Sequence, residues 1–556
     1  MRLATLIALA ALAHAEQTAV TVLATTDLHG NLLPIDYVTD KPASRGLASI
    51  ATLIRAAEAE APNHLLIDCG DTIQGTPLEY AYQTFVRTGA GPLGLKPATP
   101  LSADPMMLAM NALGYDAMAV GNHEFNFGLR NLDAARNAAK FPWLSANTTG
   151  GAHPFAPYIV KSIAGVKIAV IGITTPAVPT WEKPENLGSY RFGSPIDAVR
   201  KAVAELRAKE RPDVILVAAH SGLGPEEPAE NVVAELAAKV EGIDAIVFGH
   251  SHRELEGRII GKTLVVQPKN WGISLARLDF TFERQGSGPW TLKDRRSRLI
   301  PVKPDTAAAP DILALARPYH EFAERYLNTP VATSAVEQSA ALGRVMDSAL
   351  VDAVERVQLE YAKADVSFTA LFNPSVKVPK GEVTVRQIAA LYPYDNELYA
   401  VEGTGKMVKD ALENAARFYL SCEGARCGEP PLINRDVIGF NYDMAEGVEY
   451  EIDLTRPAGD RVRNLRFHGE PLAPDRKLRI AINNYRAAGS AGYSMFAGAP
   501  ILWRSGREIR DLLVEYYTAH KNLPAVASGN WRIVPELAAK TLAREAQAAA
   551  GQSTNQ

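Results

Sequence analysis

Short apolar runs alternate with helical patterns from about residue 20 to residue 302, and this alternation limits the folds that the chain can adopt. The runs "AVTVLA", "HLLID", "DAMAV", "KIAVIGI", "DVILVAA", "DAIVFG" and "TLVVQ" have the length and composition of buried strands. Between them, "GLASIATLIRAAEAEA" and "IDAVRKAVAELRAKE" place their apolar side chains on one helical face. We therefore expect a layered α/β domain with sheet inside and helices outside.

The pattern changes near "PVKPDTAAAPDILALARPYHEFAERYL", which predicts a connector that ends in an amphipathic helix. Beyond it, helical stretches such as "SALVDAVERVQLEYA" and "MVKDALENAARFYL" mix with strand-like stretches such as "VEYEIDLT", "VRNLRFHG" and "KLRIAINNY", so a second, α+β domain is expected. The last twenty residues are low in complexity and predict a loose helix or a disordered tail. The expected division is a signal peptide at 1–15, a first domain at 16–304, a linker helix at 305–330, a second domain at 331–535 and a tail at 536–556.

The N-terminal stretch "MRLATLIALAALAHAEQ" is typical of a cleaved secretory signal, with the mature chain starting near Glu16. No later segment approaches the roughly 18 continuous apolar residues of a membrane span. We therefore expect a periplasmic protein without a transmembrane segment. In such an oxidising compartment Cys422 and Cys427 could form a disulfide, whereas Cys69 lies in an apolar run and is expected to be a buried free thiol.

A net charge of −4 leaves no sequence-wide basic surface, which argues against a polymeric nucleic acid as partner. We expect small-molecule substrates and a monomer.

Polar side chains follow one expected strand after another. In an open α/β sheet, ligands bind outside the carboxyl ends of the strands, so these side chains should converge. Carboxylates, imidazoles and an amide oxygen suit divalent transition metals, and the set is too large for one tetrahedral ion. Two ions that share a carboxylate, about 3.5–4 Å apart, are the usual equipment for phosphoester hydrolysis. The residues are Asp27, His29, Asp71, Asn122, His123, Glu124, His220, His250 and His252.

Each of these residues alone is better explained as a cap or a core side chain. Their repetition at successive strand ends is what predicts a dinuclear site.

The motifs "DLHGN", "GDTIQG", "GNHEFNFG", "AHSGLG" and "GHSH", in this order, resemble those of the 5′-nucleotidase and 2′,3′-cyclic phosphodiesterase family of metallophosphoesterases. The stretches "INRDVIGFNYDMAEGVEYEIDL" and "INNYRAAGSAGYSMF" are similar to the C-terminal substrate-binding domain of that family. The resemblance covers nearly the whole chain. It implies a calcineurin-type catalytic domain with α/β/β/α-like layers, followed by an α+β domain.

The resemblance also implies roles for the strand-end residues. One metal would be held by Asp27, His29 and His252, the other by Asn122, His220 and His250, with Asp71 bridging both. The ions would be divalent zinc, manganese, iron or cobalt, and would offset the charge that grows on the phosphoryl oxygens during in-line attack. His123 would lie beside the substrate phosphate and stabilise or protonate that region.

One position departs from many 5′-nucleotidases. They have Asp at the end of "GNHEFD", where it orients the histidine, whereas this chain has Asn126. An amide can hold an imidazole but adds no negative charge, so we expect His123 to be less biased toward its protonated form. The asparagine resembles the cyclic phosphodiesterase branch, whose members convert 2′,3′-cyclic nucleotides to 3′-nucleotides and these to nucleoside and phosphate.

Three alternatives stay open. The first is a 5′-nucleotidase or UDP-sugar hydrolase. The second is a thiosulfohydrolase, because sulfur-oxidation enzymes resemble this metal domain but would not need an aromatic pocket. The third is a non-enzymatic binding protein, which would be expected to have lost metal ligands, and none is missing from this sequence.

Aromatic residues of the second domain are candidates for nucleobase binding. Phe440 and Tyr442 are two residues apart on an expected strand and should share a face, and Tyr493 follows the glycine-containing "AAGSAG". The resemblance implies that Tyr442 and Tyr493 sandwich the base, with Phe440, Asn484 and Arg486 as neighbours. Core packing is the alternative for each ring.

Overall fold

The computed structural model describes residues 15–224, 230–394 and 396–553. Apart from Ala15, the expected signal peptide lies outside the described residues. The chain divides into two compact units, with the division between Tyr326 and Leu327, and each unit is described by itself.

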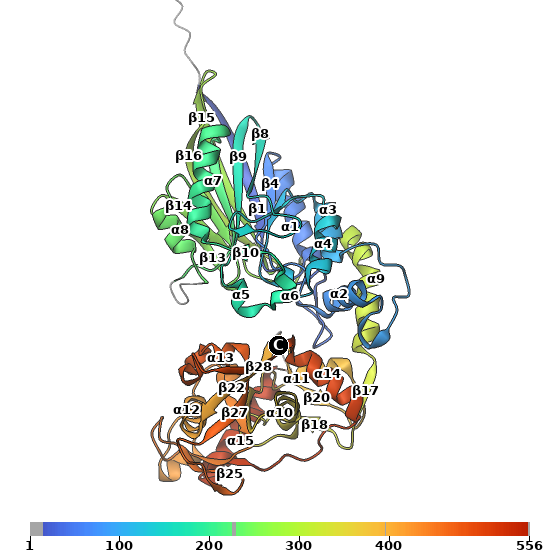
Figure 1. The fold of residues 1–556 in the computed structure, drawn as a ribbon, viewed down its shortest axis with the longest axis vertical. Coiled ribbons are helices and arrows are strands. Elements are labelled where there is room, and N and C mark those ends of the chain that lie inside the picture. Colours follow the sequence, from blue (N-terminus) through green and yellow to red (C-terminus); the bar gives the residue numbers. More distant parts are fainter. Residues whose placement is uncertain (1–14, 225–229, 395, 554–556) are drawn as a thin grey trace, which may run out of the picture. The chain divides into compact units, whose positions relative to one another are not determined.

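The first unit contains two six-stranded sheets (Figure 1). The first sheet consists, in order, of β16 (Thr291–Pro301), β15 (Ser274–Gln285), β1 (Ala15–Thr25), β4 (His64–Asp68), β5 (Ala117–Ala119) and β6 (Trp143–Leu144). The second consists of β13 (Leu255–Ile260), β14 (Thr263–Gln267), β12 (Ala245–Phe248), β11 (Val214–His220), β9 (Val166–Thr174) and β8 (Tyr158–Ile163). The seven apolar runs of the sequence are all strands of these sheets, as predicted.

The two sheets pack face to face over a core of alternating strand residues such as Val22 of β1 and Val170 of β9, both fully buried. Helices cover the outer faces (Figure 1). On the second sheet these are α7 (Pro195–Lys209) and α8 (Val233–Lys239), and on the other side α1 (Leu47–Glu60), α2 (Pro77–Thr88), α3 (Pro105–Leu113) and α4 (Leu129–Ala138). The layered α/β fold with two central sheets is therefore confirmed.

The central strands of both sheets are parallel, which aligns their carboxyl ends. Thr25 at the end of β1 pairs with Asp68 at the end of β4, and Ala219 of β11 pairs with Phe248 of β12. The loops that follow these four strands therefore start from one edge of the sandwich. Two short helices, α5 (Val178–Trp181) and α6 (Pro184–Leu187), follow β9.

The second unit mixes helix and sheet, as expected. Its five-stranded sheet has the order β23 (Asp443–Glu446), β19 (Val366–Ala370), β27 (Lys477–Asn483), β22 (Glu397–Thr404) and β28 (Ile501–Glu508). A four-stranded sheet consists of β26 (Glu470–Pro471), β25 (Val462–Phe467), β24 (Glu449–Asp453) and β29 (Trp531–Val534). The helices are α10 (Ala349–Ala362), α11 (Val385–Leu391), α12 (Gly405–Ala415), α13 (Asn484–Ala487), α14 (Ile509–His520) and α15 (Glu536–Ser553), while α9 (Pro310–Leu327) ends at the division.

The C-terminal stretch is more ordered than its composition predicts. It forms α15, whose residues Ala538 and Leu542 are fully buried. The side chain of Glu545 accepts a hydrogen bond from Leu432 N at 2.8 Å. The spacing of these contacts at i, i+4 and i+7 places them on one helical face, and this face packs on the second unit.

The states of the three cysteines agree with the sequence analysis. Cys422 and Cys427 form a disulfide, and Cys69 is a buried free thiol. None of the helices in the described part of the chain has the length and apolar composition that a bilayer span requires.

The packing of α15 predicts that Leu542→Ala lowers the free energy of unfolding by about 2–5 kcal/mol, the usual loss for a buried leucine. Leu537 on the same helix is 45% exposed, so Leu537→Ala is the matched control and should cost much less. Urea unfolding followed by tyrosine and tryptophan fluorescence measures both. Equal losses would mean that α15 is not docked through Leu542.

Candidate metal centre

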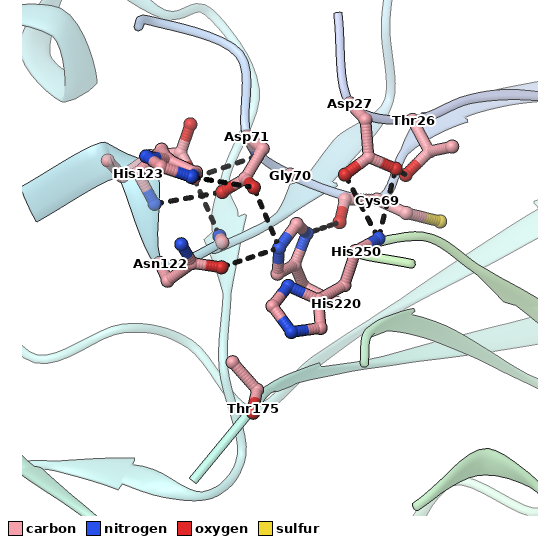
Figure 2. Close-up of polar contacts among 12 residues, drawn as sticks. Thr26, Asp27, Cys69, Gly70, Asp71, Asn122, His123, Thr175, His220 and His250 are labelled. Carbon is pink, nitrogen blue, oxygen red and sulfur yellow. Dashed lines mark hydrogen bonds and ion pairs between the residues drawn. The ribbon is translucent and has the colours of Figure 1, made fainter. Parts of the chain in front are cut away.

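The ends of five strands and the loops that follow them carry the candidate ligands to one edge of the first unit (Figure 2). Asp27 and His29 follow β1, and Asp71 follows β4. His220 is the last residue of β11, and His250 and His252 follow β12. Asn122 and His123 come after β5.

Two groups of three side chains have ligand atoms within 4.8 Å of one another. The first group is Asp27, His29 and His252, and the second is Asp71, His220 and His250. The first group has the same members as the set that the resemblance implies for one metal. The second combines His220 and His250 of the other set with Asp71, and Asn122 adjoins it. Each group takes residues from both sheets.

In the first group two imidazole nitrogens face each other. His29 Nε2 lies 2.9 Å from His252 Nε2, which lies 3.5 Å from Asp27 Oδ1. His29 Nδ1 lies 3.1 Å from the carbonyl oxygen of Gln74, so it carries the proton and donates there. The neutral ring therefore presents the lone pair of Nε2 to the group, which is what a metal ligand requires.

The second group has the same arrangement around His220. Its Nδ1 donates to Cys69 O at 2.8 Å, while Nε2 lies 3.0 Å from both Asp71 Oδ2 and Asn122 Oδ1 (Figure 2). Both oxygens are acceptors. Nε2 can therefore contact them only as an N–H donor or, through its lone pair, as a ligand of a cation that all three share. This donor set fits a divalent transition metal.

The charges of the second group depend on one another. Burial opposes a charge on the His220 ring, but the adjacent Asp71 carboxylate outweighs it and raises the pKa of His220 to about 10. Burial and the charge on His220 lower the pKa of His250 to about 3. His250 Nε2 is 2.5 Å from Glu230 Oε1, which leaves Nδ1 for the centre.

Asp71, a member of the second group, also adjoins the first. Its Oδ2 is 3.0 Å from His220 Nε2 of the second group and 3.8 Å from His29 Nε2 of the first. This position is compatible with the predicted bridging role.

The backbone at the centre adopts a conformation that residues other than glycine rarely take. Five of the seven predicted ligands, all but Asn122 and His220, have positive φ angles. These are Asp27 (49°), His29 (46°), Asp71 (59°), His250 (72°) and His252 (53°). Such residues cost about 1–3 kcal/mol each and persist only where the surroundings hold them in place.

Glu124 is one group that holds this backbone, and the sequence alone gave it no role. Its buried carboxylate accepts from the backbone N–H groups of Asp71 at 3.0 Å, Thr72 at 2.6 Å and Gly121 at 2.7 Å. Burial and the Asp71 carboxylate raise its pKa. A Cβ at Gly121 would lie 2.2 Å from Asp71 Oδ1, so only glycine allows this approach. The feature of the sequence that could have indicated this role is the run "GNHE", in which Glu124 directly follows Asn122 and His123.

His123 lies beside the groups and belongs to neither. Its backbone N–H donates to Asp71 Oδ1 at 2.8 Å, and its Nε2 lies 3.9 Å from Asp71 Oδ2. The ring is T-shaped to that of His29, with centroids 5.2 Å apart. With 30% of its side chain exposed, it can meet a ligand from solvent.

The structure does not place Tyr442 and Tyr493 where a base could stack on them. Tyr442 is 1% exposed and stacks on Phe418, and Tyr493 is 0% exposed under the guanidinium of Arg486. Phe440 does not share a face with Tyr442, because residues Gly439–Asn441 form a 3-10 turn and not a strand. Both tyrosines are core residues of the second unit, which corrects the expected sandwich.

The polar neighbours also have internal partners. Arg486 forms an ion pair with Asp443 at 2.7 Å and donates to Phe440 O at 2.9 Å. Asn484 Oδ1 accepts from Glu397 N at 3.1 Å. Among the described residues of this region, three aromatic rings reach the surface: Phe440, 39% exposed, Tyr394, 42% exposed, and Tyr485, 59% exposed. Tyr485 was missed because its neighbours in "INNYR" were read as the polar contacts.

Two family models match this chain. Residues 20–254 match "Calcineurin-like phosphoesterase", and residues 330–498 match "5'-nucleotidase, C-terminal domain".

Relatives of known name extend the likeness along the chain. A 2′,3′-cyclic-nucleotide 2′-phosphodiesterase/3′-nucleotidase of Salmonella typhimurium is 32% identical over 96% of this chain and 91% of its own length. The trifunctional nucleotide phosphoesterase protein YfkN of Bacillus subtilis is 31% identical, and the chain spans 40% of its length. The solved structure of a 5′-nucleotidase precursor from Thermus thermophilus matches with a TM-score of 0.59 at 25% identity, over 93% of this chain and 99% of the other.

The position of Asp71 predicts that Asp71→Ala loses divalent metal from both groups, because its carboxylate adjoins both. Elemental analysis after zinc loading and dialysis measures the bound metal. Asp305 is exposed, and Asp305→Ala is the matched control that should keep the wild-type content. Full zinc content in Asp71→Ala would show that Asp71 is not shared.

Proposed function

The chain belongs to the 5′-nucleotidase and 2′,3′-cyclic phosphodiesterase family of calcineurin-like metallophosphoesterases, and from this membership we propose that it hydrolyses 2′,3′-cyclic nucleotides to 3′-nucleotides, and these to nucleoside and phosphate. The class of reaction, metal-dependent hydrolysis of phosphoric esters, follows from the family. The observation that carries the finer proposal is the full-length likeness to a relative with that name.

The donor sets of the two groups fit divalent ions, and we assign one ion to each group with Asp71 shared between them. When bound, the ions supply Lewis acidity that activates water and offsets charge on the phosphoryl oxygens. Zinc, manganese, iron and cobalt all suit imidazole and carboxylate ligands. The chain's own contribution is to fix the ligand nitrogens through second contacts, such as Gln74 O on His29 and Cys69 O on His220.

His123 is our candidate for the group that acts on the substrate phosphate. Its ring lies at the margin of the centre, close enough to Asp71 to adjoin a bound phosphoryl group and too far to belong to either group. An imidazole there can hold or transfer a proton at the leaving oxygen. Asn122 contributes through its amide oxygen beside His220.

We propose that the second unit recognises the base through exposed rings. A ring can stack on a base only if it offers a face, which favours Phe440 and Tyr485 over the buried tyrosines. The Phe440 ring adjoins that of Tyr394, which is 42% exposed, with the ring centroids 6.4 Å apart. A Cβ at Gly439, next to Phe440, would lie 2.2 Å from Arg344 Nη1. The Arg344 guanidinium donates to the carbonyl oxygens of Leu371 and Phe372. We propose that the Arg344 guanidinium is a cationic contact for an anionic substrate.

The remaining proposals concern the whole protein. We propose that the signal is cleaved near Glu16, that the enzyme acts in the periplasm on small nucleotides, and that it is a monomer. The catalytic domain would span 16–304 and the nucleotide-binding domain 331–535, joined by a helix at 305–330.

A substrate panel on metal-analysed protein tests the function. We expect the highest kcat/KM for 2′,3′-cyclic AMP and 3′-AMP, with 5′-AMP and UDP-glucose much lower and bis-p-nitrophenyl phosphate hydrolysed through the same centre. A preference for 5′-AMP or UDP-glucose would assign the chain to the 5′-nucleotidase branch instead. Failure on all five esters would leave the thiosulfohydrolase and the non-enzymatic binding protein as alternatives.

Base recognition predicts that Tyr485→Ala lowers kcat/KM for 2′,3′-cyclic AMP roughly 5- to 150-fold, from about 1–3 kcal/mol of stacking per base. Hydrolysis of bis-p-nitrophenyl phosphate, which has no base, should change little. Tyr485→Phe keeps the ring and should keep most of the activity. Equal losses on both esters would mean that Tyr485 supports the fold and does not contact the base.

A further inference from the structure

We propose that Glu182 is a positioning residue that fixes the tautomer and orientation of His123 through the side-chain amide of Asn126. The inference rests on the proposed role of His123 at the substrate phosphate. It adds a residue from a different part of the chain, 56 positions after Asn126, to the machinery of the centre.

The first contact links the imidazole to the amide. His123 Nδ1 lies 2.6 Å from Asn126 Oδ1, and an amide oxygen only accepts. The ring therefore carries a proton on Nδ1, and in its neutral form presents the lone pair of Nε2 on the side of Asp71. This holds only while the amide keeps its oxygen toward the ring, because a flipped amide would present N–H groups and demand the other tautomer.

The second contact prevents that flip. Asn126 Nδ2 donates to Glu182 Oε2 at 2.6 Å, and a carboxylate can only accept. The NH₂ group must therefore face Glu182, and the oxygen must face His123. An aspartate in place of Asn126 would need no such partner, since both of its oxygens accept.

Glu182 is itself held in place. Its Oε1 accepts from its own neighbour's backbone, Lys183 N, at 2.8 Å and from Asn186 Nδ2 at 2.8 Å. Asn186 Nδ2 also lies 3.2 Å from Asn126 O, which ties the loop of Asn126 to α6. Trp181, the residue before Glu182, packs its ring 5.6 Å from that of His250, so the same short segment contacts both His250 and Asn126.

This chain of contacts changes the expectation drawn from Asn126. The amide itself adds no charge, but a carboxylate stands directly behind it. The Glu182 carboxylate therefore supplies the negative charge that an aspartate at position 126 would carry in many 5′-nucleotidases. It lies one side chain further from the His123 ring, and its effect reaches the ring through the oriented amide dipole of Asn126.

Glu182→Gln tests the relay with an isosteric change. The glutamine oxygen can serve Lys183 N and Asn186, but its NH₂ group then faces Asn126 Nδ2, so the amide of Asn126 should flip. We expect kcat to fall about 10- to 100-fold, the range for partners that orient functional histidines, with little change in KM. Glu185→Gln removes the same charge from the next helix at an exposed position and should leave kcat unchanged.

Nitrogen NMR of the zinc-loaded enzyme, labelled with ¹⁵N-histidine, reports the tautomer directly and needs no substrate. His123 is one of 11 histidines and is assigned by the signal lost in His123→Asn. We expect Nδ1–H in the wild type and a mixture or Nε2–H in Glu182→Gln. This readout separates failure of the relay from failure of the nucleotide assignment.

The sharpest test exchanges the amide and the carboxylate between positions 126 and 182. Asn126→Asp alone sets two carboxylates face to face and should lose activity. In the double variant Asn126→Asp with Glu182→Gln, the glutamine NH₂ donates to the introduced aspartate and its oxygen still serves Lys183 N and Asn186. Hydrolysis of bis-p-nitrophenyl phosphate should then exceed that of both single variants, with Nδ1–H restored. Unchanged turnover and tautomer in Glu182→Gln, or a double variant no better than the worse single, would overturn the proposal.

Discussion

A carboxylate buried among histidines is the interaction on which the first unit depends. Asp71 is 1% exposed, and three imidazole Nε2 atoms lie within 4 Å of its Oδ2. A buried charge without a partner would cost several kcal/mol, so cationic groups must gather around it. Burial acts against its ionised form, yet the charge on His220 holds the pKa of Asp71 well below its usual range. The site therefore holds a buried carboxylate, and neighbouring cationic groups must balance its charge.

Hydrogen bonds to groups that can only accept hold this arrangement. Glu124 binds the backbone around Asp71, the carbonyl of Cys69 fixes His220, and Glu182 fixes the amide beside His123. The carbonyl determines which ring nitrogen of His220 carries the proton, and the Glu182 carboxylate determines which way the Asn126 amide faces. Two of the left-handed residues are held through their backbone N–H groups, Asp71 by Glu124 and His250 by the carboxylate of Asp27.

The sequence predicted the layered fold because buried strands of parallel sheets are continuous apolar runs, and it predicted which side chains converge because strand ends share an edge. It could not predict Glu182, since contacts between distant loops leave no local pattern. The expected face shared by Phe440 and Tyr442 was wrong because alternation applies only to strands, and this stretch is a turn. In α15 the alanine-rich composition concealed the few side chains that dock it.

Each group of ligands takes residues from both sheets of the sandwich. Asp27 and His29 follow the first sheet and His252 the second, while Asp71 follows the first and His220 and His250 belong to the second. Neither sheet alone can assemble a complete coordination sphere. A metal held by these residues would find its full set of ligands only once the sheets have docked, and its binding would tie the two sheets together.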